Sequence, residues 1–236
     1  MNILVIAALA FAPGIFWLWY FYRKDKIEPE PKQLIIKVFL LGMLAVVPAA
    51  IIELPFLTMN SFVVIVFVAP VVEEIIKYLF VSHGVYRDAE FDEPMDGIVY
   101  ACAVALGFAS LENVGYLLQI YIKPESYTHF FGVTSLAGKV SMVFLIRALL
   151  TVPGHALWSS MWGYALGRAK FLDEEQGKPL IFKGILLAIL SHAVFNFLLL
   201  LSYFSALGML ILVPVLWRII NKKITNSIAG SPHVKE

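Results

Sequence analysis

The sequence predicts an all-α fold: a polytopic bundle of about seven transmembrane helices. Hydrophobic residues make up 60% of the 236 residues and charged residues only 15%, and the mean hydropathy is +0.82. A helix that crosses a bilayer needs about 20 apolar residues. Apolar runs of that length recur along the chain with short polar connections between them, which leaves no room for a sizeable soluble domain.

The predicted spans are long apolar stretches, and most of the connections between them are rich in charged residues and contain proline. The spans cover residues 3–22, 34–54, 60–82, 96–121, 140–167, 181–203 and 205–220. The last two are close enough in sequence to form a hairpin. We therefore predict one transmembrane domain over 1–221, followed by a short mobile cytoplasmic tail over 222–236.

Lysine and arginine are distributed unequally between alternate connections. They gather in 23–32, 83–94 and 168–183 and after the last span, whereas the opposite connections hold only Lys123 and Lys139. Because cytoplasmic loops carry the excess of Lys and Arg, the N-terminus is predicted outside and the C-terminus in the cytoplasm. Basic residues gather at membrane boundaries and not in one patch, so no nucleic-acid partner is expected. The single cysteine, Cys102, is predicted to be a small buried hydrophobe.

Two adjacent carboxylates, Glu73 and Glu74, lie deep inside the third span. A charge near the centre of a spanning helix costs roughly 2.5 to 3.5 kcal/mol on insertion scales. A rise of about 1.5 Å per residue places His155 of the fifth span and His192 of the sixth at overlapping depths. Asn196 lies one turn from His192 on the same face. Several spans therefore carry polar groups into one slab of the bilayer, where we expect a shared hydrated cavity.

Other polar residues of the spans are predicted to support this cavity. Glu112, Asn113 and Tyr116 lie somewhat higher on the fourth span, and Arg147 lies about two turns outward of His155. Each has a plainer alternative: Glu112 and Asn113 an interhelical hydrogen bond, Arg147 a counter-ion or a snorkelling residue, and Tyr116 a packing residue. Lys77 alone would also make a structural ion pair with either glutamate, but one lysine cannot neutralise two.

Glutamates, two histidines and an amide inside a membrane are the groups that peptide hydrolysis needs. In one mechanism Glu73 or Glu74 takes a proton from water, assisted by His155, while His192 and Asn196 donate to the oxyanion. In the other, Glu73, His155 and His192 bind a zinc ion and Glu74 is the base. Spacing does not choose between them, since the chain has no HExxH motif.

The chain resembles the PrsW family of intramembrane proteases. The resemblance rests on EEIIKY at 73–78, DGIVYACAVALGFASLENVGY at 96–116, RALLTVPGHAL at 147–157 and SHAVFNF at 191–197, with the opening segment APGIFWLWYFYRKDKIEPEP. It implies a bacterial multi-pass membrane enzyme that makes the first cut in a membrane-anchored anti-sigma factor. It leaves the oligomeric state undetermined.

More distantly, the chain is similar to the CPBP or Abi superfamily, which includes the type II CAAX prenyl endopeptidases. This similarity implies catalytic roles for Glu73, Glu74, His155, His192 and Asn196. Two positions depart from the wider pattern: Tyr78 stands where arginine is expected and Thr151 where phenylalanine is expected. PrsW relatives are labelled metalloproteases and the CAAX branch resembles glutamate-dependent hydrolases, so the cofactor is expected to be none or zinc, with a slight preference for none.

Two other classes of function compete with the protease prediction. Membrane-embedded glutamates and histidines also form proton relays, as in a proton- or cation-coupled transporter. Transporter folds often contain duplicated halves, and we find no such repeat in this sequence. A non-catalytic membrane scaffold would leave the clustered carboxyl groups without a role.

Overall fold

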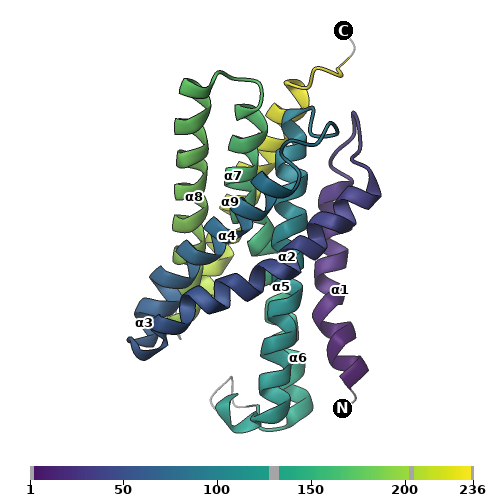
Figure 1. Ribbon diagram of the computed structural model, residues 1–236. Coiled ribbons are helices and arrows are strands. Elements are labelled where there is room, and N and C mark those ends of the chain that lie inside the picture. Colours follow the sequence, from purple (N-terminus) through teal and green to yellow (C-terminus); the bar gives the residue numbers. More distant parts are fainter. Residues whose placement is uncertain (1–2, 128–132, 202–204, 235–236) are drawn as a thin grey trace.

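The computed structural model describes residues 3–127, 133–201 and 205–234 and shows a bundle of long helices (Figure 1). Over these ranges the regular elements are all helical, which confirms the predicted fold class. The α-helices are α1 (Ile3–Tyr22), α2 (Lys32–Glu53), α3 (Ser61–Val63), α4 (Ala69–Gly84), α5 (Pro94–Ile122), α6 (Leu136–Ile146), α7 (Val152–Ala169), α8 (Glu174–Leu200) and α9 (Ser205–Ala229). Shorter turns are η1 (Leu54–Thr58), η2 (Val64–Val68), η3 (Pro124–Tyr127) and η4 (Arg147–Thr151).

Seven long helical stretches correspond to the seven predicted spans, because α3, η2 and α4 run on as one helix, as do α6, η4 and α7. Within the described part of the chain, five of the stretches are by length and composition apolar enough to cross a membrane: Ile3–Tyr22, Lys32–Thr58, Pro94–Ile122, Leu136–Ala169 and Glu174–Leu200. The stretch 61–84 has three charged residues in its middle and α9 has several near its end, which shortens their uncharged runs.

The core lies around α5, which packs against α7, α2 and α1. Glycines allow this close approach. A Cβ added at Gly107 would lie 1.9 Å from the carbonyl oxygen of Phe39 on α2, and one added at Gly42 would lie 2.0 Å from that of Val104 on α5. Since both distances are shorter than any van der Waals contact, these two helices meet backbone to backbone.

The two ends of the chain lie at opposite ends of the bundle (Figure 1). The connections after α1, α4 and α7 lie at the same end as the C-terminus, the end that the distribution of basic residues assigns to the cytoplasm. The sequence predicts a tail from residue 222, whereas α9 continues to Ala229 and the chain is described as far as Val234.

Two π-helical turns interrupt the helices that carry Glu73 and His155. In η2, the N–H of Ala69 donates to Val64 and not to Ile65, and the next residue is Pro70, which has no N–H. In η4, the N–H of Val152 donates to Arg147, and Pro153 follows. Each turn therefore leaves one carbonyl without a partner in its own helix.

Side chains of other helices supply the missing donors. The Asn196 amide of α8 donates to the carbonyl of Ile65 at 2.9 Å, and the Trp17 indole of α1 donates to the carbonyl of Ala148 at 2.9 Å. Backbone polar groups at membrane depth need such partners because no bulk water reaches them.

Candidate active site

Polar residues of five long helical stretches line one cavity of about 420 Å³, which we call the membrane cavity. The stretches are α2, α3 to α4, α5, α6 to α7 and α8. Its ionisable and amide-bearing lining residues are Glu53, Glu73, Glu112, Tyr116, Arg147, His155, His192 and Asn196. The convergence that the sequence predicts from matching depths is therefore present in the structure.

Lys77 lies at the centre of the two neighbouring glutamates. Its ammonium group is 3.0 Å from Glu73 Oε2 and 2.9 Å from Glu74 Oε1, and the side chain is fully buried. It also lies 4.2 Å from the centroid of the Phe108 ring, a cation–π distance. The structural ion pair considered from the sequence is real, and it binds both carboxylates through one cation.

Glu73 and Glu74 differ in their surroundings although they are adjacent in the chain. Glu74 is 0% exposed, and its Oε2 accepts hydrogen bonds from Ser159 at 2.7 Å and from the Trp162 indole at 3.1 Å. Glu73 lines the membrane cavity, and the side chain keeps 10% of its accessible surface. Glu74 is thus enclosed by donors, and Glu73 is the carboxylate that faces the open space.

His155 lies between two charged groups of opposite sign. Its Nδ1 is 3.1 Å from the Lys77 ammonium and its Nε2 is 3.2 Å from Glu112 Oε2. Because an ammonium group only donates, Nδ1 accepts from Lys77 and Nε2 carries the proton that faces Glu112. The imidazole is therefore held as the neutral tautomer with its proton on Nε2.

His192 is fixed by stacking. Its ring is 4.4 Å from the Trp158 ring at an interplanar angle of 18°, and 5.4 Å from the His155 ring. Its Nδ1 is 3.3 Å from Glu74 Oε1 without the alignment of a hydrogen bond. The second histidine is thus close to the same carboxylate pair while it lines the cavity.

The supporting residues form a second ion pair beside the first. Arg147 Nη2 is 2.6 Å from Glu112 Oε2, and Arg147 Nε donates to the Asn113 side-chain oxygen. The Asn113 amide donates to the carbonyl of Ala10 at 3.1 Å, and the Tyr116 ring lies 4.1 Å from the Arg147 guanidinium carbon. Arg147 is therefore a counter-ion, as one of the sequence alternatives proposed, and Asn113 connects it to α1.

Three participants were missed from the sequence. Glu53, at the end of α2, lines the same cavity, and its position as a lone acid after an apolar run was the available signal. Ser159 and Trp162 on α7 both donate to Glu74, and in the sequence they resemble ordinary packing residues of a span. Their spacing from His155 on α7 places them on the side of that helix that meets α4, which only the structure reveals.

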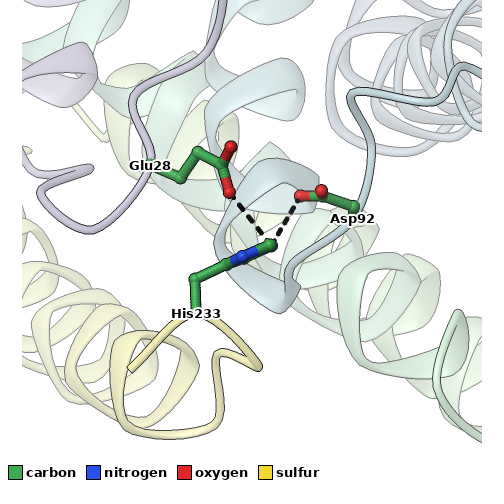
Figure 2. A group of neighbouring side chains, drawn as sticks. All are labelled: Glu28, Asp92 and His233. Atoms are coloured by element: carbon green, nitrogen blue, oxygen red, sulfur yellow. Dashed lines mark ion pairs between the residues drawn. The ribbon is translucent and has the colours of Figure 1, made fainter. Parts of the chain in front are cut away.

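Two further groups of acidic residues lie at the C-terminal end of the bundle. Glu28, Asp92 and His233 form a surface ion-pair group (Figure 2), in which His233 Nε2 is 3.0 Å from Glu28 and 3.2 Å from Asp92. The pKa of His233 is raised by these two carboxylates. The other group, around Asp25, Glu93 and Asp96, is buried.

The fold and the cavity define a polytopic membrane protein with an ionisable site enclosed by its spans. Residues 30–219 match the PrsW family of intramembrane metalloproteases. The chain is 36% identical to "Protease PrsW" of Geobacillus kaustophilus over 85% of its length and 84% of the relative. It is 33% identical to that of Bacillus subtilis over 82% of both chains, and 31% identical to that of Clostridioides difficile over 93% of its length and 88% of the relative.

The chain belongs to the PrsW family of intramembrane metalloproteases, and it is a multi-pass bacterial membrane enzyme of the protease class. No solved structure matches it. The family assignment favours the protease prediction over the transporter that competed with it.

The family's description raises the question of a metal ion in the membrane cavity. Among the described residues, Glu73, His155 and His192 do not bring three ligand atoms within bonding reach of one ion, and Lys77 lies between the glutamates and His155. An ammonium group in that position repels a divalent cation and takes the lone pair of His155 Nδ1. As arranged, these residues do not fit a zinc ion.

Proposed function

We propose that the membrane cavity hydrolyses a peptide bond of a membrane-anchored protein by a metal-free mechanism in which Glu73 activates water. The observation that supports this most directly is the contrast between the two glutamates: Glu73 faces the cavity, and Glu74 is enclosed by donors. Glu73 Oε2 accepts from Lys77, which leaves Oε1 for a water molecule. A base must lie within hydrogen-bond reach of the proton it removes, and Glu73 alone of the pair meets this requirement.

The other residues then take separate roles. Glu74 positions Lys77, which in turn orients Glu73 and the neutral imidazole of His155. His192, which lines the cavity, donates to the oxyanion or to the leaving amine. Asn196 was predicted as an oxyanion donor. One N–H of its amide donates to the carbonyl of Ile65, which positions the side chain at the cavity wall, and the second N–H is left for the oxyanion.

The experiment is cleavage of a single-span substrate, tagged on both sides of the membrane, by the purified protein in phospholipid vesicles. Glu73→Gln keeps the shape and the bond from Lys77 but removes the base, so we expect the rate to fall about 100-fold or more. Glu90→Gln, an exposed acid in the connection before α5, is the matched control and is expected to retain full activity. Undiminished cleavage by Glu73→Gln would refute this assignment.

For the physiological substrate we propose a membrane-anchored anti-sigma factor, as the resemblance of the sequence to PrsW proteases implies. Coexpression of the protein with the single-span anti-sigma factors of its source organism tests this, with loss of one full-length band expected from the wild type and not from Glu73→Gln. If only an unrelated tagged substrate is cleaved, the peptidase proposal stands and the substrate proposal is wrong.

A further inference from the structure

Four acidic residues at the C-terminal end of the bundle form a buried group that we call the carboxylate cluster. Asp25 and Glu30 come from the connection between α1 and α2, and Glu93 and Asp96 from the start of α5. Their exposed fractions are 4%, 3%, 0% and 1%, in that order. Segments that are far apart in the sequence thus place four carboxyl groups out of contact with solvent.

The outer oxygens of the cluster are held by donors. Asp25 Oδ2 accepts from the N–H of Glu30, Glu30 Oε2 from the Tyr100 hydroxyl, and Asp96 Oδ2 from the N–H groups of Asp92 and Glu93 at 2.8 and 2.7 Å. These bonds fix the orientation of three carboxylates. Such fixing is what a preorganised ligand site requires.

The inner oxygens lack donors. Five buried oxygen atoms accept no hydrogen bond of full geometry: Asp25 Oδ1, Glu30 Oε1, both carboxylate oxygens of Glu93, and Asp96 Oδ1. Glu93 is fully buried, and its carboxyl group faces the Asp25 carboxyl and, in a capping box, the backbone N–H of Asp96, without an N–H or O–H donor at full hydrogen-bond geometry. Such buried acceptors are rare because each costs about 1 to 3 kcal/mol. Five buried carboxylate oxygens without such a donor indicate a site for a positively charged ligand.

The surrounding protein does not supply that charge. Within the described ranges, no Lys or Arg forms an ion pair with any of the four acids. The nearby Lys170 donates to the carbonyl of Tyr86 at 2.6 Å and lies over the rings of Tyr86 and Phe91. The N-terminus of α5 offers a partial charge of roughly +0.5, far less than four carboxylates need.

Ligand atoms of Asp25, Glu93 and Asp96 all lie within 4.8 Å of one another. Two oxygens on opposite sides of a cation are about 4.2 Å apart for Mg²⁺ and up to about 5 Å for Ca²⁺, since the bond lengths are 2.0–2.1 and 2.3–2.6 Å. Ligands that are all carboxylate oxygens favour Mg²⁺, Mn²⁺ or Ca²⁺ over zinc or copper.

We infer that the carboxylate cluster binds one divalent cation of this oxygen-preferring class, and that the ion joins the connection between α1 and α2 to the start of α5. The competing explanation is that protons are shared within the cluster. Burial and the neighbouring Glu93 raise the pKa of Asp25 to about 8, and burial raises that of Glu30 to about 7, so carboxyl pairs are the expected state of an ion-free cluster.

The test is a titration of purified full-length protein in detergent, freed of metal by chelation, with Mn²⁺ followed by electron paramagnetic resonance. We expect one Mn²⁺ per chain to lose its free signal and to be displaced by excess Mg²⁺ or Ca²⁺. At 100 times the dissociation constant, bound ion is expected to raise the midpoint of thermal unfolding by about 5 °C or more. A wild-type protein that neither retains Mn²⁺ nor shows this shift would overturn the inference.

Substitutions inside and outside the carboxylate cluster test whether the ion binds there. Glu93→Gln and, independently, Asp25→Asn are expected to weaken Mn²⁺ binding at least tenfold, whereas the exposed Glu90→Gln retains it. His233→Ala in the surface ion-pair group and His155→Ala in the membrane cavity are also expected to retain it. If either histidine variant loses the ion while Glu93→Gln keeps it, the assignment to the carboxylate cluster is wrong. These outcomes do not depend on peptidase activity.

Discussion

The membrane cavity and the carboxylate cluster are both buried groups of acidic residues, but they balance their charge differently. In the cavity, Lys77 binds Glu73 and Glu74, and Arg147 binds Glu112. In the cluster, five carboxylate oxygens lack an N–H or O–H donor at full hydrogen-bond geometry, and within the described ranges no Lys or Arg forms an ion pair with its four acids. Three of the cavity's acids are thus paired with cations of the chain itself, with Glu53 as the exception, whereas we infer that the cluster takes its cation from outside. A metal associated with this protein is therefore expected at the cluster and not at the reacting groups.

The largest expected loss of stability comes from removing the cation that pairs the glutamates of the cavity, so that its carboxylates become as unpaired as those of the cluster. Lys77→Met removes the shared cation and leaves two buried carboxylates unpaired, which costs about 3 to 5 kcal/mol. We expect a large fall in the thermal unfolding midpoint in detergent and poor accumulation in membranes. A Lys77→Met protein as stable as the wild type would mean that the ion pairs contribute nothing, and the contrast between the two regions would fail.

The hydrogen bond between the Asn196 amide and the carbonyl of Ile65 involves no charge, so its removal tests whether uncharged contacts also stabilise the helices around the cavity. Asn196→Leu removes the donor to the carbonyl of Ile65. Its own helix offers no replacement, because Ala69 donates to Val64 and Pro70 has no N–H. We expect destabilisation of about 1 kcal/mol, the lower end of the cost of an unsatisfied acceptor, because the carbonyl lies at the wall of the cavity and not in the packed core. Trp17→Phe is the matched change at the other π turn and should have a similar effect. Equal unfolding midpoints for wild type and both variants would contradict this account.

The cluster is expected to respond in the opposite sense when it holds no ion. Glu93→Gln removes one of the buried acids that repel one another or must take up a proton when no ion is bound, so in the presence of chelator we expect the variant to be more stable than the wild type by about 1 kcal/mol. The order should reverse when Mn²⁺ is added. Thermal unfolding of both proteins under both conditions measures this, and a variant that is less stable in chelator as well would show that Glu93 has a contact of its own.

The smallest effect concerns the surface ion-pair group. The raised pKa of His233 means that the ion pairs with Glu28 and Asp92 are fully present below pH 6.5 and are lost as the pH rises through the folded value. We expect limited proteolysis to remove the C-terminal segment faster at pH 9 than at pH 6. His233→Gln should show no such dependence beyond that of the protease itself. A wild-type protein cut equally at both pH values would refute this role.

Much of the bundle was predictable because apolar length and the high cost of intramembrane charge are both visible in a sequence. The depths of Glu73, His155 and His192 predicted their convergence for the same reason. Their separate roles were not predictable, since which glutamate faces the cavity depends on Ser159 and Trp162 of another helix.

The carboxylate cluster escaped prediction because Asp25, Glu30 and Glu93 lie in connections that look like ordinary solvated loops. Only the folded chain shows them buried. The bond from Asn196 to the carbonyl of Ile65 was also hidden, because a π turn on another helix leaves no signature in spacing. The length of the last helix was similarly hidden, as α9 continues to Ala229 through a polar stretch that resembles a tail.

Pro70 lies three residues before Glu73, and Pro153 lies two residues before His155. Because proline has no N–H, each of these helices has a carbonyl that only a neighbouring helix can satisfy. The helix with the carboxylate depends on α8 and the helix with the imidazole depends on α1, each through a single carbonyl. Withdrawal of either neighbour would expose an amide dipole to lipid. Attachment to these two helices thus places the carboxylate of Glu73 and the imidazole of His155 on separate supports.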